Sequence, residues 1–396
     1  MAELLANVFK KGALAATFEH TDAGLKFEYL HDYLANQGAP VASTLPIHGV
    51  PITLPNGAAP AFFAGLLPEG RRLDAMARRI KTSRDNDIAL LTEIGQDLIG
   101  DVQVLAPGGD PNDSRPTLEL DTKYENLDFD QIREQQFGSA AGGIPGVQDK
   151  VSSKMLNVPA RRANVEHILK FNPMDAPFAV ENECLFLGLA SRCGLDVAPN
   201  RMLTDSVGQH ALLIERFDRI STPTTPIKLA AEDGCQVLNL YPADKYEADW
   251  VSLAQGLINL CPSRGVAGFT LFKQLVFNWL VGNGDAHAKN FSVLEGQDGE
   301  FMISPAYDLL CTFFYEDKTM ALPVDGQASD WSRKSLIEVA QKIRVPARAA
   351  EKVIDHQLAT LANLPEQIIS GALPFRRDQN FDAAKFLKQR AKRLAD

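Results

Sequence analysis

Apolar and polar positions alternate along the first 30 residues, as they do in half-buried β-strands. Positions 14, 16 and 18 are apolar, and so are positions 25, 27 and 29. Lys11-Gly12 precedes the first of these runs and predicts a hairpin turn. Residues 39–60 are rich in Pro, Gly and Ala and are expected to be irregular. The chain is therefore expected to begin with β structure.

Helical spacing follows this β segment. Residues 66–79 read as one helix, and a second helix, capped by Ser83 or Asp85, is predicted through positions 88, 91 and 94. Residues 100–105 return to a strand pattern. The Pro- and Gly-rich residues 106–116 are the best linker candidate in the chain. We therefore predict a β-rich first domain over residues 1–106.

The middle of the chain mixes strand and helix signals. Strand patterns occur over residues 147–156, 166–171 and 209–215. Residues 158–162 are expected to turn between the first two strands, and residues 179–192 are predicted to be helical from their apolar spacing. These elements define a predicted second domain over residues 117–219.

From about Ser252 onward the apolar spacing is mainly helical. Apolar residues between positions 269 and 280 fall three and four apart on more than one side, which predicts a buried helix. Gly282-Asn283-Gly284 is expected to end it, because Gly and Asn tolerate the left-handed conformation. Residues 291–303 are the exception and read as a short hairpin. We predict a helical third domain over residues 220–396, and hence an α+β fold for the chain.

A short polar string, GDAHAKN at residues 284–290, follows the buried helix. Asp285 and Asn290 lie in it, and the predicted hairpin should return Asp308 to a place beside Asn290. Two carboxylates and an amide at one point are the minimum set for holding Mg²⁺ and orienting a hydroxyl in phosphoryl transfer. We predict that Asp285 faces the acceptor hydroxyl and that Asn290 and Asp308 bind the metal. Lys289 would steady the γ-phosphate, so the predicted catalytic residues are Asp285, Lys289 and Asn290.

Other interpretations of this string stay open. In a loop without function, Asp285 and Asn290 would only cap backbone groups. For His287 a structural role in orienting the loop is favoured over a catalytic one. We nevertheless count His287, with Lys289, Asn290 and Tyr307, among the residues predicted to contact the nucleotide.

A kinase also needs a loop over the phosphates and a lysine that reaches them. Residues 141–150 are rich in Gly and open a predicted strand, but they match neither common phosphate-loop pattern, and a flexible turn is the alternative. Lys170 lies within an apolar strand. If it points inward it needs an anion, such as nucleotide phosphates or Glu181 or Glu183 of the next helix. If it points outward, it is an ordinary surface lysine. The apolar strand that breaks into charges at residues 215–218 is a candidate for the segment that joins two lobes and faces adenine.

Composition sets limits on this picture. The 396 residues suffice for two or three domains. A net charge of −10, from 40 basic and 50 acidic residues, argues against a chain that coats nucleic acid by itself. Five cysteines at irregular spacing, without a CxxC pair, suggest reduced thiols. We see no signal sequence and no stretch long and apolar enough to cross a bilayer. We therefore expect a cytoplasmic protein with no membrane partner.

Six motifs in this order resemble the HipA family of serine/threonine kinases, the toxins of HipA–HipB toxin–antitoxin pairs. They are GVQDK (146–150), HILKF (167–171), IERFDR (214–219), DGCQVLNLYPADKYE (233–247), GDAHAKNFS (284–292) and SPAYDLL (304–310). The strings GLLPEG (65–70) and IGQDLIGDVQVL (94–105) also resemble this family. The resemblance thus covers nearly the whole chain.

The resemblance implies a bilobal, protein-kinase-like fold. It would have a β-rich N-terminal subdomain, a kinase-like small lobe and an all-helical C-terminal lobe. The resemblance implies Asp285 as the catalytic base, Asn290 and Asp308 as Mg²⁺ ligands and Lys170 as a contact of the ATP phosphates. It also implies nucleotide contacts from the loop residues Pro145, Gly146, Val147, Gln148, Asp149 and Lys150, and from Glu215, Arg216 and Phe217 at the adenine.

Characterised family members phosphorylate aminoacyl-tRNA synthetases and bind a small helix-turn-helix antitoxin, and the pair represses its own operon. The resemblance therefore implies ATP and Mg²⁺ as cofactors, a protein substrate, a HipB-like antitoxin and operator DNA reached through it. Family members often carry a serine ahead of the nucleotide loop, whose phosphorylation inactivates the enzyme. Here residues 142–145 read GGIP and the nearest upstream serine is Ser139, so this sequence leaves self-inactivation open.

Three functions are compatible with these residues. The first is an ATP- and Mg²⁺-dependent serine/threonine protein kinase, which the complete set of kinase residues favours. The second is a small-molecule kinase, which needs the same metal site, although the extra N-terminal subdomain argues against it. The third is a non-catalytic co-repressor that stabilises a DNA-bound antitoxin. In that case a run of basic residues would contact DNA phosphates. The alternative is that the run is only a solvated helix face. Its residues are Arg71, Arg72, Arg78, Arg79, Lys81 and Arg84.

Overall fold

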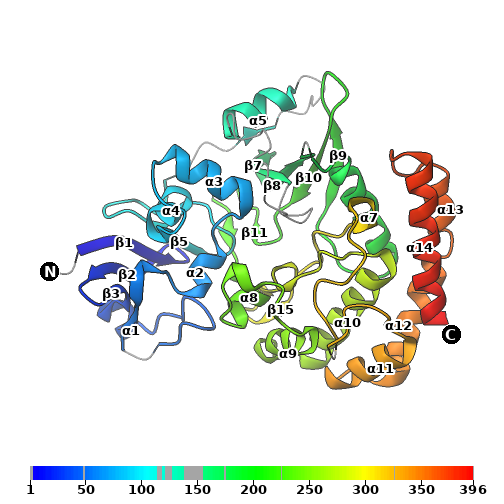
Figure 1. The fold of residues 1–396 in the computed structure, drawn as a ribbon. Coiled ribbons are helices and arrows are strands. Elements are labelled where there is room, and N and C mark those ends of the chain that lie inside the picture. The colour runs from blue at the N-terminus through cyan, green and yellow to red at the C-terminus, as the bar shows by residue number, and fades with distance from the viewer. Residues whose placement is uncertain are drawn as a thin grey trace.

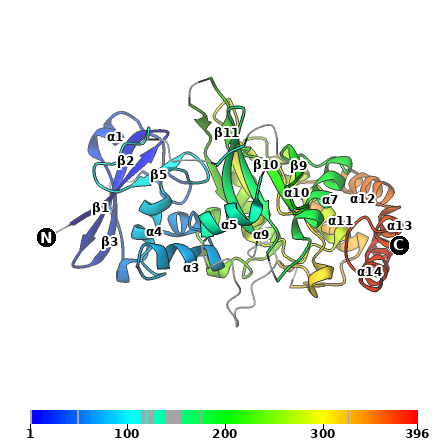
Figure 2. The ribbon, with the colours of Figure 1, turned by 90° about the horizontal axis from the view of Figure 1, so that it is seen from above.

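The computed structural model shows three parts that follow one another along the chain (Figure 1). An N-terminal subdomain lies at the left of the view, a small lobe at the top, and a helical lobe carries the C-terminus at the opposite end. The view from above shows the same end-to-end arrangement (Figure 2). The structure describes residues 3–47, 50–113, 118–120, 127–137, 155–173, 175–223, 225–324 and 326–395.

The N-terminal subdomain is built on a five-stranded antiparallel sheet with the strand order β4-β3-β2-β1-β5. The predicted hairpin at Lys11-Gly12 is confirmed, because both residues have positive φ (49° and 78°) between β1 and β2. Phe63 of a covering helix packs against Phe18 and Phe27 of the sheet. The elements are β1 (Glu3–Lys10), β2 (Ala13–Thr21), β3 (Gly24–Tyr29), α1 (His31–Ala35), β4 (Ile52–Leu54), α2 (Ala61–Gly65), α3 (Gly70–Arg79), α4 (Asp87–Ile94) and β5 (Val102–Leu105).

Some predictions for this subdomain are wrong in detail. The single helix expected over residues 66–79 begins only at Gly70, because Pro68 lacks a helix donor and Gly70 is left-handed (φ 53°). Helix α4 is capped by Asn86, whose side chain accepts from the Ala89 amide at 3.3 Å, and not by Ser83 or Asp85. The segment expected to be irregular over residues 39–60 contains β4, which pairs with β3.

The small lobe holds a second five-stranded sheet, with the order β6-β7-β8-β10-β9. The strands predicted near residues 166–171 and 209–215 and the helix predicted over 179–192 are confirmed. The elements are β6 (Leu118–Glu119), α5 (Phe129–Phe137), β7 (Leu156–Arg162), β8 (Val165–Phe171), α7 (Ala179–Arg192), β9 (Asn200–Thr204) and β10 (His210–Glu215).

The turn predicted over residues 158–162 is wrong, because these residues belong to β7 and pair with β8. The chain turns instead at Ala163-Asn164, where two positive φ angles (49° and 65°) are those of a tight hairpin turn. Pro159 is tolerated in β7 because, among the described residues, only the short β6 pairs on the far side, which makes β7 close to an edge strand. The strand expected over residues 147–156 lies almost wholly outside the described residues.

The C-terminal lobe is mainly helical, as predicted, but it is not all-helical. A three-stranded sheet, β13-β14-β15, and a two-stranded sheet, β11-β12, lie within it. The strands are β11 (Arg219–Ile220), β12 (Ile227–Lys228), β13 (Ala231–Asp233), β14 (Ser292–Glu295) and β15 (Phe301–Ile303). The helices are α8 (Gly234–Val237), α9 (Trp250–Leu260), α10 (Arg264–Val281), α11 (Arg333–Lys342), α12 (Ala347–Thr360), α13 (Leu364–Ile369) and α14 (Arg377–Ala395).

Three buried apolar clusters hold these parts together. One fills the N-terminal subdomain, a second lies within the small-lobe sheet, and the largest extends from α7 through α10 to α14. Helix α7 thus connects the small lobe to the helical core, although the boundaries predicted at 106, 117 and 219 stay a prediction. No helix in the described part of the chain has both the length and the apolar character needed to span a bilayer. All five cysteines are free thiols. The α+β fold class is confirmed.

Candidate active site

The polar loop after α10 is anchored to the core of the helical lobe. Gly282 ends α10 in the left-handed conformation (φ 72°), as the sequence predicts. The Asn283 side chain then donates to Asn278 Oδ1 at 2.8 Å and to the main-chain oxygen of Asp308 at 3.1 Å. One asparagine therefore joins the helix end, the loop and the segment that carries Asp308.

Asp285 is fully buried beside this anchor. Its Oδ1 accepts a hydrogen bond from the Tyr246 hydroxyl at 3.1 Å. Its main-chain oxygen accepts a hydrogen bond from the side-chain amide of Asn290 at 3.1 Å. Burial and the negative charge of Asp285 raise the pKa of Tyr246, which therefore stays protonated and can donate. The two ends of the polar loop are in this way held together.

The predicted hairpin returns the chain to the same loop. Strands β14 and β15 pair from Val293–Ile303 to Glu295–Phe301. The Tyr307 hydroxyl then donates to the Lys289 main-chain oxygen at 2.7 Å and lies 2.5 Å from the Ser292 hydroxyl. Asp308 follows in the left-handed conformation (φ 52°), which an aspartate tolerates better than a bulky residue would. The hairpin prediction is confirmed, and joint metal binding by Asn290 and Asp308 stays a prediction.

Lys170 points inward from β8 and lies between two carboxylates. Its Nζ is 2.8 Å and 3.0 Å from the two oxygens of Glu183 on α7, and 2.5 Å from Asp308 Oδ1. Lys170 is 5 % exposed and Glu183 is fully buried. Of the two partners considered from sequence, Glu183 is therefore the one that pairs, while Glu181 instead contacts His210 and Asn172. Burial opposes the charge on Lys170, but Asp308 and Glu183 outweigh it and raise the pKa of the lysine.

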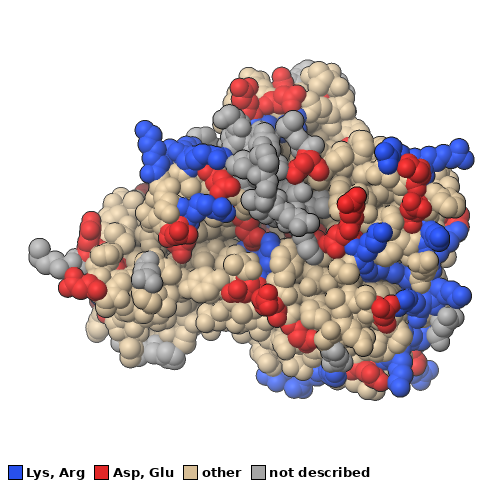
Figure 3. Space-filling model, in the orientation of Figure 1, with Lys and Arg blue, Asp and Glu red and all other residues tan. Residues whose placement is uncertain are grey.

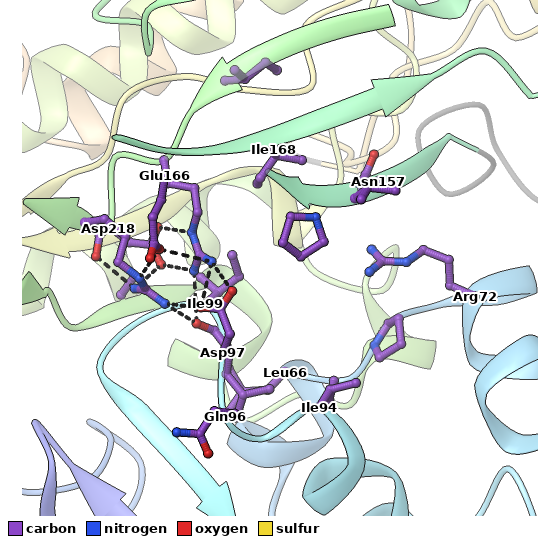
Figure 4. Close-up of a pocket in the computed structure, with 18 of the residues that line it drawn as sticks. Leu66, Arg72, Ile94, Gln96, Asp97, Ile99, Asn157, Glu166, Ile168 and Asp218 are labelled. Carbon is purple, nitrogen blue, oxygen red and sulfur yellow. Dashed lines mark hydrogen bonds and ion pairs between the residues drawn. The ribbon is translucent and has the colours of Figure 1, made fainter. Parts of the chain in front are cut away.

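A cleft of about 1180 Å³ lies where the three parts meet. Its walls include Lys170 and Ile168 of β8, Glu215 at the end of β10, Phe217 just beyond it, and Tyr307 and Asp308 after the hairpin. Phe217 and Tyr307 lie with ring centroids 5.8 Å apart, which provides an aromatic surface beside the joining segment. In Figure 4, Ile168 of β8 and Leu66 and Ile94 of the N-terminal subdomain line opposite sides of this cleft. Asp285, His287 and Asn290 are buried next to it and are not among its lining residues.

Arg216, predicted to contact the nucleotide, has its side chain committed to a buried ion-pair network. The guanidinium donates to Asp97 at 2.9 and 3.0 Å and to Asp218 at 2.8 and 3.0 Å. Both aspartates are labelled in Figure 4, where dashed lines mark the network around them. The main-chain amide of Arg216 donates to the main-chain oxygen of Glu166 at 2.9 Å. A nucleotide contact by Arg216 would therefore involve its main-chain carbonyl oxygen. Arg219 adds bonds to Asp218 and to the main chain of the N-terminal subdomain at Leu98 and Gly100. This network fastens the segment between the lobes to the N-terminal subdomain.

Replacing Arg216 by Met is expected to lower the free energy of unfolding by about 3 kcal/mol, because the buried Asp218 and the partly exposed Asp97 each lose one of their two arginine partners. Urea denaturation followed by tryptophan fluorescence measures this. Arg79→Met is the matched control, since Arg79 pairs with Glu93 at 2.7 Å on the surface and should change stability by less than about 1 kcal/mol. Equal effects of the two substitutions would contradict a structural role for the Arg216 network.

Lys289 does not point freely into the cleft, although it lies in its wall. Its Nζ is 3.0 Å from Glu69 Oε1, 3.8 Å from Asp233 Oδ2, and donates to the Gly65 main-chain oxygen at 2.9 Å. Glu69 also pairs with Lys245. Burial opposes the charge on Glu69, but Lys289 and Lys245 outweigh it and lower the pKa of Glu69 from 4.5 to about 2. A contact between Lys289 and a γ-phosphate would have to compete with these bonds.

The low pKa of Glu69 predicts a loss of stability in acid. Because the pKa is lowered on folding, the stabilisation is complete above the unfolded value of 4.5 and is lost as the pH falls toward 2. The shift corresponds to roughly 2–3 kcal/mol at neutral pH. Urea denaturation of the wild type and of Glu69→Gln should therefore show a stability difference at pH 7 that shrinks between pH 5 and pH 3. A difference independent of pH would contradict the ion pairing.

His287 is buried and its ring lies edge-on to Tyr246, with centroids 5.2 Å apart. Burial and the neighbouring Lys245 lower the pKa of His287 well below its ordinary value, so the ring is neutral at physiological pH. Its main-chain amide donates to the Asp285 oxygen at 2.8 Å, which fixes the turn of the loop. These contacts favour the structural role over a catalytic one.

The predicted nucleotide loop, Pro145 to Lys150, lies outside the described residues. In the part of the chain that the structure describes, no group of three or more His, Cys, Asp or Glu side chains is placed to hold a metal ion. A cation at Asn290 and Asp308 would therefore complete its coordination with phosphate oxygens and water, as Mg²⁺ commonly does.

The comparisons with known proteins agree with this arrangement. The model of the HipA N-terminal domain matches residues 6–105, and the model of the HipA-like C-terminal domain matches residues 142–364. The chain belongs to the HipA family. A relative from Sinorhizobium fredii, named "Putative kinase Y4mE", is 30% identical over 333 residues, which are 78% of each chain.

Two comparisons with HipA of Shewanella oneidensis support the same assignment. The "Serine/threonine-protein kinase toxin HipA" is 26% identical over 336 residues, covering 78% of this chain and 76% of the relative. A solved structure of HipA with HipB and operator DNA superposes with a TM-score of 0.75 at 20% identity and covers 98% of this chain and 97% of that one. The superposition shows that the whole HipA fold, the bilobal kinase-like body included, is present here.

Several residues of the site were not predicted from the sequence. Tyr246 holds Asp285, Glu69 holds Lys289, and Asp97 holds Arg216. The available signal was that all three lie in strings that resemble the family: Glu69 in GLLPEG, Asp97 in IGQDLIGDVQVL and Tyr246 in DGCQVLNLYPADKYE.

Proposed function

We propose that the protein is an ATP- and Mg²⁺-dependent serine/threonine protein kinase and the toxin of a toxin–antitoxin pair. The observation that carries this proposal is Lys170, held in the cleft wall between Glu183 of α7 and Asp308. Protein kinases need a strand lysine paired with a helix glutamate, together with a metal-binding aspartate. This arrangement links the two lobes at the point where nucleotide phosphates would bind.

The donor set fits a hard divalent cation. Asp308 offers a carboxylate oxygen in the cleft wall. The side-chain nitrogen of Asn290 donates to the Asp285 main-chain oxygen, so the side-chain oxygen of Asn290 is left for a cation. When bound there, Mg²⁺ would neutralise charge on the β- and γ-phosphates. Within the chain, Lys170 would bind the phosphates, and Phe217 and Tyr307 would contact the adenine region.

Asp285 would act on the protein substrate. It would accept the proton of a serine or threonine hydroxyl as the hydroxyl oxygen bonds to the γ-phosphorus and the bond to the β-phosphate oxygen breaks, releasing ADP. The Tyr246 hydrogen bond and the bond from Asn290 to the Asp285 main chain would keep the carboxylate oriented for that transfer. Because Asp285 is fully buried in this structure, substrate binding must expose it.

The partners are proposed from the relatives. The named toxin relative is a serine/threonine kinase, and the superposed HipA was solved with HipB and operator DNA. We therefore propose a HipB-like helix-turn-helix antitoxin as partner, with operator DNA reached through it. A translation component such as an aminoacyl-tRNA synthetase is the proposed substrate class, and growth arrest the proposed outcome.

The basic run on and after α3 gives limited support to a purely DNA-binding role. Basic side chains gather over α3 in Figure 3, but acidic ones lie among them. Arg79 pairs with Glu93 at 2.7 Å, and Arg84 pairs with Asp74 at 3.0 Å. These pairs neutralise part of the run, as expected for a solvated helix face.

Labelled ATP separates the proposed protein kinase from a small-molecule kinase. The purified chain is incubated with labelled ATP and Mg²⁺ and with either desalted lysate proteins or the metabolite fraction. We expect label in protein, no label when EDTA removes the metal, and phosphoserine or phosphothreonine peptides by mass spectrometry. Label confined to the metabolite fraction would favour the small-molecule kinase, and no transfer to either fraction would contradict the proposal.

A further inference from the structure

Glu69 is a half-buried contact between the N-terminal subdomain and the catalytic loop. It lies between α2 and α3, and its side chain is 26% exposed. Its carboxylate contacts two lysines of the C-terminal lobe, Lys245 and Lys289, the latter at 3.0 Å. No carboxylate closer in sequence makes both contacts among the described residues. The charge that the two lysines need therefore comes from another subdomain.

Both lysines are attached to the loop that carries Asp285 and Asn290. The Lys245 main-chain oxygen accepts from the Ala288 amide at 3.1 Å, and Lys289 immediately precedes Asn290 in a 3₁₀ turn. The next residue in the chain from Lys245, Tyr246, donates to Asp285. A change in the position of Lys245 or Lys289 is therefore transmitted directly to the predicted base and metal ligand.

Contacts around Glu69 fix its position relative to the loop. The Lys289 ammonium group also donates to the Gly65 main-chain oxygen at 2.9 Å, and the Gln236 side chain donates to the Phe62 main-chain oxygen at 2.9 Å. Gly65 and Gln236 are so close that a methyl group on Gly65 would lie 2.9 Å from Gln236 Cγ. Helix α2 is thus seated against the C-terminal lobe beside the loop, and Glu69 has little freedom to move away.

We propose that Glu69 is a positioning residue, by which the N-terminal subdomain holds the catalytic loop in its active geometry. This inference rests on the proposed kinase function. Without the Glu69 charge, Asp233, 3.8 Å from Lys289, would be the one carboxylate among the described residues left paired with Lys245 or Lys289. Repulsion between the two lysines would shift the loop, and small shifts in the position of catalytic groups have large effects on rate.

The test compares Glu69→Gln, Lys245→Met and the double variant with the wild type in the full-length chain. Glu19→Gln is the matched control, because Glu19 pairs with Lys26 at 2.7 Å within the sheet of the same subdomain. For each protein, kcat for phosphate transfer, the Kd for Mg²⁺-ATP and amide hydrogen exchange over residues 284–292 are measured. Thermal denaturation reports the folded fraction.

For Glu69→Gln we expect kcat to fall about 10- to 100-fold, while the Kd for Mg²⁺-ATP stays within about threefold, because Glu69 does not line the cleft. Exchange over residues 284–292 should rise, and the double variant should lose less than the product of the two single losses. Glu19→Gln should match the wild type in all three measurements.

An unchanged kcat in a folded Glu69→Gln protein would overturn the inference, as would exchange that rises equally along the whole chain. Hydrogen exchange also separates this proposal from the proposed function. If the wild type transfers no phosphate, the kinase assignment fails. A rise confined to residues 284–292 would still support a positioning contact, and no rise would refute it.

Discussion

Asp285→Asn is expected to reduce kcat for phosphate transfer by about 10²- to 10⁴-fold, the range in which a positioned general base contributes to catalysis. The amide oxygen of the replacement can still accept the Tyr246 hydrogen bond, which is 3.1 Å long in this structure. The shape of the buried site is therefore kept while the negative charge and the basic group are lost. Binding of Mg²⁺-ATP should change little, since Asp285 is not in the cleft wall.

Single-turnover phosphate transfer to lysate protein, with Mg²⁺-ATP binding measured separately, tests this expectation. Asp298→Asn is the matched control, because Asp298 lies in the exposed turn of the β14–β15 hairpin, where it accepts a bond from the Glu300 amide at 3.2 Å. The control should transfer phosphate at the wild-type rate. A folded Asp285→Asn protein that also does so would remove Asp285 from the catalytic step.

Local sequence signals predicted the elements that position the site. Apolar spacing gave α7 and α10, the Gly-Asn-Gly string gave the end of α10, and the hairpin after residue 291 was visible from its turn. These elements are determined by neighbours in sequence, and for that reason a single sequence reveals them. The turn assigned to residues 158–162 was wrong because Pro159 suggests a break, whereas its position near the sheet edge makes it harmless.

Contacts between distant segments could not be predicted in the same way. Strand β13 pairs with β14 across about 60 residues, with Glu232 opposite Val293, and nothing local marks three residues as a strand. The sequence does not show that Lys289, which stays a predicted γ-phosphate contact, meets Glu69 far away in the chain. Nor does it show that Arg216, for which the resemblance implies a nucleotide contact, meets Asp97 of another subdomain. In each case the sequence shows a charge but does not show which distant charge it meets.

These long-range pairs have a common consequence for function. The N-terminal subdomain holds the joining segment through Asp97 and Arg216, and it holds the catalytic loop through Glu69 and Lys289. These are the two parts whose relative position sets the geometry of a kinase cleft. A third contact, Ser43 to Glu232, fastens the same subdomain to β13 at 2.6 and 2.8 Å. The subdomain thus contacts both the segment between the lobes and the C-terminal lobe.

Lys170→Met is expected to reduce kcat/KM for ATP by about 10²- to 10³-fold, the usual cost of losing one charged group aimed at a reacting phosphate. The same change should lower the free energy of unfolding by about 3 kcal/mol, because Glu183 and Asp308 would be left as two close carboxylates without a cation. The two effects have different causes, so they can be separated.

A double variant, Lys170→Met with Glu183→Gln, makes that separation. Removing the buried charge of Glu183 together with its partner should restore most of the stability measured by urea denaturation, but it should not restore phosphate transfer. Lys228→Met is the control, because Lys228 lies in the same cleft wall and its side chain donates to the Gln96 main-chain oxygen at 3.0 Å, away from Glu183 and Asp308. If the double variant regains wild-type transfer, Lys170 serves only to neutralise Glu183. If stability returns without activity, the lysine does more than neutralise Glu183, and it acts through its contact with Asp308 or with the phosphates.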